Sequence, residues 1–149
     1  MSVTSISSEP MGKVLTRLTI TNRADEIRAA SGVIPADAVR SVTLENVLVD
    51  TGATTLCLPQ EEIARLGLDL LREVDVSTAQ GLGRARLFQD AKISLLGRTG
   101  TFECLELPAG TPPLIGVIPL EALGIEPDLR NQRLRLLPES GSDTYLTAL

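Results

Sequence analysis

The chain has 149 residues, of which 43% are hydrophobic, and a formal net charge of −5 at pH 7. This length and composition fit one folded domain with an ample core and exclude a largely disordered chain. The negative charge and the three aromatic residues (two Phe and one Tyr) argue against a nucleic-acid-binding surface, and the apolar stretches are too short to span a membrane.

The sequence contains no histidine, which restricts the chemistry that it can perform. Ser-His-Asp and Cys-His catalysis and His-ligated zinc are excluded, and carboxylates, lysines and hydroxyl groups remain. Cys57 and Cys104 are isolated, so we expect two buried thiols, while a disulfide between them stays open. We expect no metal and no other cofactor. The N-terminal segment lacks the basic and apolar regions of a signal peptide, which favours a cytoplasmic location.

The N-terminal third predicts a tail followed by strands. Residues 1–12 are polar and are expected to form a flexible tail. Residues 14–21 largely alternate between apolar and polar side chains and predict a strand. Residues 24–30 fit either a helical turn or a polar loop. Two further strands are predicted at 39–44 and 46–50, and the second leads into an Asp-Thr-Gly turn.

A short strand at Leu56–Leu58 and a helix are predicted next. Pro59 is suited to the start of the helix, and acidic residues in its first turn are favoured by the helix dipole. Ile63 and Leu66 are expected on its inner face, and Gly67 ends it.

Two β-hairpins follow the helix. The strands of the first are predicted at 74–79 and 84–88, with a glycine-containing turn at Gln80, Gly81, Leu82 and Gly83. The second joins strands at 92–96 and 101–107 through a turn at 97–100.

The C-terminal part predicts a turn-rich connection at 108–113, a short helix at Pro119–Leu123 and an alternating strand at Arg133–Leu136. Many short strands with one or two short helices predict a mostly β fold, closed and barrel-like, over residues 13–138. Residues 139–149 are expected to be a C-terminal tail.

Val47–Ala53 is the most informative segment, because an apolar, β-branched run delivers one aspartate onto a Thr-Gly turn. A carboxylate at the end of a hydrophobic strand is costly unless it has a use, and Gly52 permits the tight turn that presents it. A second motif at Pro113–Gly124 contains Leu-Ile-Gly and then a short helix that ends at glycine.

The two motifs together resemble the retropepsin-like aspartic protease family, and the chain is similar to a bacterial-type single-domain member. The resemblance implies the acid-protease fold with Asp50 as the catalytic residue. It also implies that Thr51, Gly52 and Gly116 support the site and that Ala53 lines the substrate cleft. Gln80, Gly81, Leu82 and Gly83 would form a flap over a bound peptide.

Asp50 lies in the only Asp-Thr-Gly sequence of the chain. Two carboxylates that share one proton are needed to activate water without a metal or a covalent nucleophile. One chain is therefore half of a site, and we expect a symmetric homodimer that pairs Asp50 with its copy. The predicted function is aspartic endopeptidase activity on peptides or proteins, with no nucleic-acid or membrane partner.

The sequence also fits several alternatives. Gly81 and Gly83 also fit ordinary turn glycines, and the whole chain also fits a non-catalytic peptide-binding or dimerisation module on the same fold. Viral retropepsins carry acidic residues after the Asp-Thr-Gly-Ala motif and an arginine after the later glycine. Thr54, Thr55 and Val117 occupy the matching places here. The tail at 139–149 also fits an interface strand of the dimer.

Overall fold

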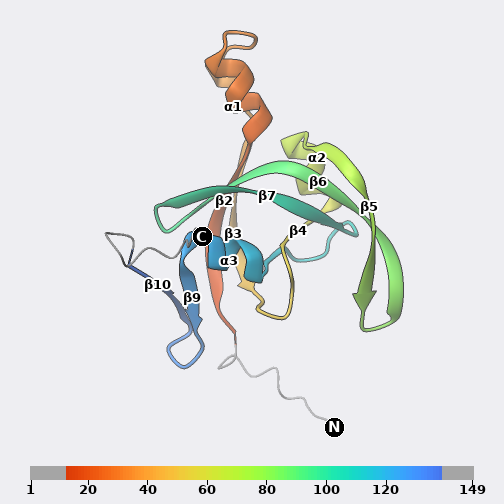
Figure 1. Cartoon of the computed structure of the whole chain (residues 1–149), viewed down its shortest axis with the longest axis vertical. Coiled ribbons are helices and arrows are strands. Elements are labelled where there is room, and N and C mark those ends of the chain that lie inside the picture. Colours follow the sequence, from red (N-terminus) through yellow and green to blue (C-terminus); the bar gives the residue numbers. More distant parts are fainter. Residues whose placement is uncertain (1–12, 139–149) are drawn as a thin grey trace, which may run out of the picture.

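A ring-like sheet makes up most of the structure, a computed structural model that describes residues 13–138 (Figure 1). The tails expected at 1–12 and 139–149, including the interface strand, lie outside the described residues. The elements are, in chain order, β2 (Leu15–Asn22), α1 (Arg23–Ala30), the 3₁₀ helix η3 (Ala36–Ala38), β3 (Ser41–Val49), β4 (Leu56–Pro59), α2 (Gln60–Leu66), β5 (Asp69–Thr78), β6 (Gly81–Leu95), β7 (Arg98–Leu107), β8 (Leu114–Ile115), α3 (Val117–Leu123), β9 (Ile125–Asp128) and β10 (Arg133–Leu136).

The seven-stranded sheet has the order β2-β3-β8-β4-β7-β6-β5, and β2 also pairs with β6. The six strands from β2 to β6 in this order therefore close into a ring, and β5 extends the sheet beyond β6. β9 and β10 form a separate two-stranded sheet. The mostly β, barrel-like prediction is confirmed, although the described part of the chain holds three α-helices where one or two were expected. The additional helix is α1, at the segment whose sequence also fitted a loop.

The long strand β6 serves both the ring and a projecting hairpin. Its register shifts between Phe88 and Ala91, where Asp90 has a positive φ of 65°. Beyond this bulge β6 pairs with β2, whereas its first half pairs with β5. The bulge bends the strand, so the β5–β6 hairpin leaves the ring and extends toward the lower side of Figure 1.

The turns of both hairpins lie earlier than predicted. Leu82 and Gly83 are part of β6 and pair with Ser77 and Val76, so the first turn is at residues 79–80. The second turn is at residues 96–97, since Arg98 already pairs with Leu95 in β7. Two-residue turns match the twist of antiparallel strands, and the sequence-based assignment was wrong because it treated every nearby glycine as a turn residue.

The core fills the inside of the ring with side chains from alternate strand positions. α2 covers one side through Ile63 and Leu66, and Gly67 ends the helix with a φ of 63°, as predicted. α3 begins at Val117, two residues before the expected start, and Pro119 lies in its first turn, where no intrahelical N–H donor is needed. The largest fully buried side chains include Leu18, Ile20, Leu56, Leu58, Leu66, Ile93, Leu95, Ile115 and Leu120.

The strand predictions for the segments outside the two hairpins hold with three differences. The two strands expected at 39–44 and 46–50 are one strand, β3, in which Asn46 has a positive φ of 57°. The register between β2 and β3 shifts at this point, which marks a bulge. β8, which pairs with β3, was not predicted as a strand. β9 was not predicted either; it contains Pro127 and pairs with the predicted strand β10.

The two cysteines lie on opposite faces of the sheet. In the parallel pairing of β4 and β7, Cys57 is opposite Leu105, and Cys104 is opposite Leu56. Paired residues share a face and successive residues alternate, so the two thiols point away from each other. Both cysteines are buried and free, and the disulfide left open by the sequence is excluded in this fold.

α1 stands away from the ring at the top of Figure 1 and is tied to it at its base. The side chain of Asn22 accepts a hydrogen bond from Asp25 N (3.0 Å) and donates one to Leu66 O (2.9 Å) in α2. The buried Asp25 carboxylate accepts two hydrogen bonds from the Arg40 guanidinium, at 2.9 and 3.0 Å.

None of the helices within residues 13–138 has the length and apolar character to cross a membrane.

The Asp25–Arg40 pair should stabilise the fold in a pH-dependent manner. The hydrogen bond from Arg40 lowers the pKa of Asp25 below its ordinary value of 3.8, although burial opposes this shift. We expect Arg40→Met to reduce the free energy of unfolding at pH 7 by about 2 kcal/mol, less than for a fully buried pair because the Arg40 side chain is 48% exposed. Urea denaturation measures this difference.

A carboxyl group whose pKa is lower in the folded than in the unfolded state stabilises the protein at pH values above its unfolded-state pKa. This stabilisation is lost as the pH falls through the folded-state pKa. The difference in the free energy of unfolding between Arg40→Met and the unsubstituted chain should therefore shrink as pH falls below 3.8. Arg17→Met is the control, since it removes an exposed pair with Glu45 and should change stability by less than about 0.5 kcal/mol. Equal losses of stability in the two variants would contradict the stabilising role of the Asp25–Arg40 pair.

Candidate active site

The loop from Asp50 to Thr55 connects β3 to β4 and carries the Asp-Thr-Gly-Ala motif. Asp50 N donates to Ile115 O in β8 (3.0 Å), and Ala53 N donates to Asp50 O (3.1 Å), so the backbone of the turn is fixed at both ends. The partly exposed Asp50 carboxylate accepts a hydrogen bond from Gly52 N through Oδ1 (2.9 Å). Its Oδ2 atom has no hydrogen-bond partner within residues 13–138.

Gly52 lies against the carboxylate that it orients. A Cβ atom at this position would be 3.2 Å from Asp50 Oδ1, which is tighter than an ordinary van der Waals contact. The absence of a side chain therefore keeps the loop narrow around the Asp50 carboxylate. Thr51 is exposed, and its hydroxyl group has no partner among the described residues.

Gly116 is the second point at which the loop is held. Its N–H donates to Thr55 O (2.9 Å), and the next two N–H groups donate to the carbonyl oxygens of Ala53 and Thr54, each at 2.9 Å. A Cβ on Gly116 would be 2.6 Å from both Ala53 O and Thr55 N. The structure thus brings the two sequence motifs together through backbone contacts that leave no room for a side chain.

A groove of about 1150 Å³ lies between this loop and the β5–β6 hairpin. Of the residues predicted to bind substrate, Ala53 and Gly83 line the groove, whereas Gln80, Gly81 and Leu82 lie outside it near the exposed end of the hairpin. Leu82 is 86% exposed. The lining consists of Gly52–Thr55, Cys57, Val74–Thr78, Gly83–Ala85, Leu87, Thr101–Glu103, Leu105–Pro108 and Ile118.

Most of this lining was missed in the sequence. The hairpin contributes residues 74–78 of β5 and 83–85 and 87 of β6, not its turn, and β7 contributes the row Thr101, Glu103, Leu105 and Leu107. Alternate residues of a strand share one face, so the sequence could have predicted that these four side chains of β7 lie on the same face. Its position beside the Asp50–Thr55 loop follows from the long-range pairing of β4 with β7, which no local pattern encodes.

Cys57 lies in the groove but is not a candidate nucleophile. Burial and the nearby Asp50 carboxylate raise the pKa of its thiol to about 11, so the reactive thiolate is scarce at neutral pH. Arg84 and Arg86 are exposed and paired with acidic neighbours. Within residues 13–138, no group of three or more metal-ligating side chains is positioned to hold an ion.

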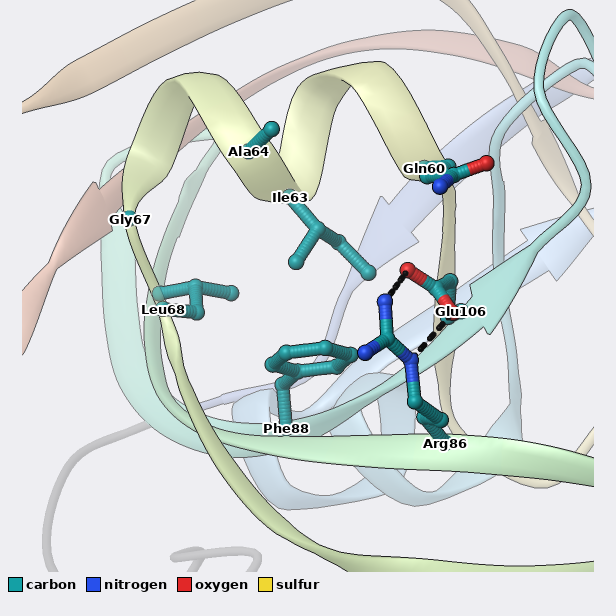
Figure 2. A pocket seen from close by; sticks show the side chains of 8 residues that line it. All are labelled: Gln60, Ile63, Ala64, Gly67, Leu68, Arg86, Phe88 and Glu106. Carbon is teal, nitrogen blue, oxygen red and sulfur yellow. Dashed lines mark hydrogen bonds and ion pairs between the residues drawn. The ribbon is translucent and has the colours of Figure 1, made fainter.

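A smaller hollow of about 220 Å³ lies between α2 and strands β6 and β7 (Figure 2). Arg86 and Glu106 face each other across its edge with two hydrogen bonds of 2.8 Å, and the guanidinium lies 5.2 Å from the centre of the Phe88 ring. Its charged groups are already paired, and it contains none of the motif residues.

The contacts at Gly116 should be intolerant of even a methyl group. We expect Gly116→Ala to reduce the free energy of unfolding by about 2 kcal/mol or more, because the new Cβ overlaps backbone atoms that cannot rotate away. Denaturant unfolding measures the change. Gly83→Ala is the matched control, since its Cβ would meet no atom within 4 Å, and similar losses in both variants would refute the packing argument.

Comparison with known proteins is consistent with this geometry. The family model for gag-polyprotein putative aspartyl proteases matches residues 41–117, which is more than half of the chain. The matched range includes Gly52 and Gly116. A solved structure of EIAV protease complexed with the inhibitor HBY-793 is similar in fold, with a TM-score of 0.52 and 20% sequence identity over 82% of this chain and 95% of that chain. The comparison with curated proteins gave no match.

At 20% identity the EIAV structure bears on the fold alone, and it agrees with the ring-like, mostly β architecture. The family model covers the Asp50 loop and extends to the start of α3. The chain therefore belongs to the gag-polyprotein putative aspartyl protease family and has the retropepsin-like fold.

Proposed function

We propose that the chain is an aspartic endopeptidase whose catalytic dyad consists of Asp50 from two copies. The family and the fold support a protease function. The observation that carries the proposal is the Asp50 carboxylate, which is fixed by Gly52 N through one oxygen, unpartnered at the other within the described residues, and placed next to a long groove.

The dyad would hydrolyse a peptide bond through an activated water. One carboxylate accepts a proton from the water as it attacks the carbonyl carbon, while the protonated carboxyl group donates to the carbonyl oxygen. Collapse of the tetrahedral intermediate breaks the C–N bond: the leaving amine takes the proton that the first carboxyl group accepted from water, and the second carboxylate recovers its proton from a hydroxyl group of the intermediate. Two carboxylates about 3 Å apart share one proton and act as a unit, so each chain needs its copy.

The groove suits an extended peptide. One wall is formed by residues 74–78 of β5, an edge strand of the sheet whose outer backbone N–H and C=O groups have no neighbouring strand in the described sheet. Apolar side chains such as Leu105 and Leu107 also line the groove. An extended substrate binds such walls through main-chain hydrogen bonds, with alternate side chains in pockets. In this proposal Ala53 lines the cleft, and the hairpin end from Gln80 to Gly83 closes over the bound peptide as a flap.

A symmetric dimer also gives Thr51 a role. Its hydroxyl group is exposed and without a partner within residues 13–138, so it is free to donate to the backbone of the second copy. Gly52 and Gly116 support the site from within one chain. The bacterial-type assignment and the cytoplasmic location remain predictions.

A second candidate function is non-catalytic peptide binding on the same fold. It is favoured by the fact that one copy already has a groove, whereas it holds only one carboxylate of the proposed dyad. Fold alone does not establish chemistry, and the two candidates are separated by the experiments below.

Asp50→Asn should remove activity while leaving the fold intact. The asparagine carbonyl oxygen still accepts from Gly52 N, but the side chain can neither take nor give the catalytic proton. We expect peptide cleavage to fall by at least about 10³-fold, measured with a fluorogenic peptide library, and the unfolding curve to change little. Asp37→Asn, at an exposed position of η3, is the control and should retain full activity. Unchanged cleavage by Asp50→Asn would refute the proposed dyad.

Mixing experiments test whether the dyad spans two chains. Added to an equal amount of the unsubstituted chain, Asp50→Asn should reduce activity per active chain to about one half, because random exchange places half of those chains in mixed dimers. Activity per chain should also fall on dilution, in parallel with the dimer fraction from sedimentation. Activity that is independent of both treatments would show that each chain works alone.

A further inference from the structure

One row of side chains on β7 forms part of the groove and contains a single charge. Thr101, Glu103, Leu105 and Leu107 alternate along the strand and all line the groove. Glu103 is held at the Asp50–Thr55 loop, because its backbone oxygen accepts a hydrogen bond from Thr55 Oγ1 (2.8 Å). An acidic side chain therefore lies in an otherwise uncharged row, next to the residue where the loop joins β4.

The other charges that line the groove are neutralised by partners. Asp75 pairs with Arg84 across the hairpin (2.9 Å). Glu106 accepts two hydrogen bonds from Arg86 at the smaller hollow, where Figure 2 shows both oxygens occupied. The Glu103 carboxylate has no hydrogen bond or ion pair with any residue of the 13–138 segment.

We propose that Glu103 selects substrates with a lysine or arginine side chain at one position of the bound peptide. This inference rests on the proposed peptide-binding groove and adds a residue that determines specificity. An unpaired carboxylate in a substrate groove attracts a cation and disfavours an anion. Asp75 and Glu106 are each paired with an arginine of the same chain. Glu103 is therefore the acidic residue of the lining that is available to the substrate.

The topology limits which substrate position Glu103 reads. β7 is separated from β3, which ends beside Asp50, by β8 and β4. With strands about 4.8 Å apart, Glu103 lies within roughly 15 Å of the Asp50 strand, and a lysine side chain covers part of that span. At about 3.3 Å per residue, the basic side chain belongs two to four residues from the scissile bond.

Peptides scanned with lysine test the assignment. In each member of the set, lysine or the uncharged norleucine occupies one position, and kcat/KM is measured at low and high salt. We expect lysine to be preferred about 5- to 10-fold at one position, because an exposed pair is worth little and becomes stronger when the hairpin excludes water. Glu103→Gln should remove the preference, Glu103→Lys should shift it to glutamate, and high salt should weaken it. Glu121→Gln, which removes the same charge from an exposed site on α3 outside the groove, is the matched control.

A binding experiment separates this inference from the proposed catalysis. It measures the affinity of the same peptide pairs after the scissile bond is replaced by an uncleavable hydroxyethylene link. Tighter binding of the lysine peptide that depends on Glu103, without cleavage of any peptide, would support the Glu103 assignment and overturn the endopeptidase proposal. Cleavage without a lysine preference, or a preference that persists in Glu103→Gln or disappears equally in Glu121→Gln, would overturn the assignment and leave the endopeptidase proposal standing. Failure to bind or cleave any peptide would overturn both.

Discussion

The close contact between Gly116 and the Asp50–Thr55 loop is the constraint on which the candidate site depends. Three consecutive N–H groups from residues 116–118 donate to loop carbonyls at 2.9 Å, and Asp50 N donates back to Ile115 O. These are backbone contacts, so they do not require a particular side chain, only the absence of one at Gly116. This explains how the loop keeps its shape with Thr54, Thr55 and Val117 at the places where viral retropepsins carry charged residues.

Features that depend on local chemistry were predictable from the sequence. The apolar run before Asp50, the Leu-Ile-Gly segment and the helix that ends at Gly67 all lie where they were expected. The hairpins were recognised, but their turns were misplaced by treating Gly83 and Gly100 as turn residues. Gly100 lies in β7, and a Cβ there would be 2.9 Å from the Phe102 ring. Its reason for being glycine is packing, which a turn rule does not capture.

Features that depend on distant partners were not predictable. The helix α1 is short and half of its residues are charged, and its base is fixed by Arg40 and by the carbonyl oxygens of Leu66 and Gly67. The groove-lining role of Glu103 depends on the parallel pairing of β4 with β7. In both cases the residue types are ordinary, and their meaning comes from the closure of the ring, which joins segments that are remote in the sequence.

The charge of Asp50 helps to decide between catalysis and mere binding. The contact from Gly52 N needs only an oxygen acceptor, which an asparagine supplies equally well. A second carboxylate oxygen with no partner in the described chain adds nothing to the stability of the loop. When two copies face each other, two such charges repel unless a proton is shared between them. In the proposed dimer, a binding module would gain by losing this charge, whereas a peptidase requires it, so the proposed proton transfer accounts for the aspartate and the architecture of the groove does not.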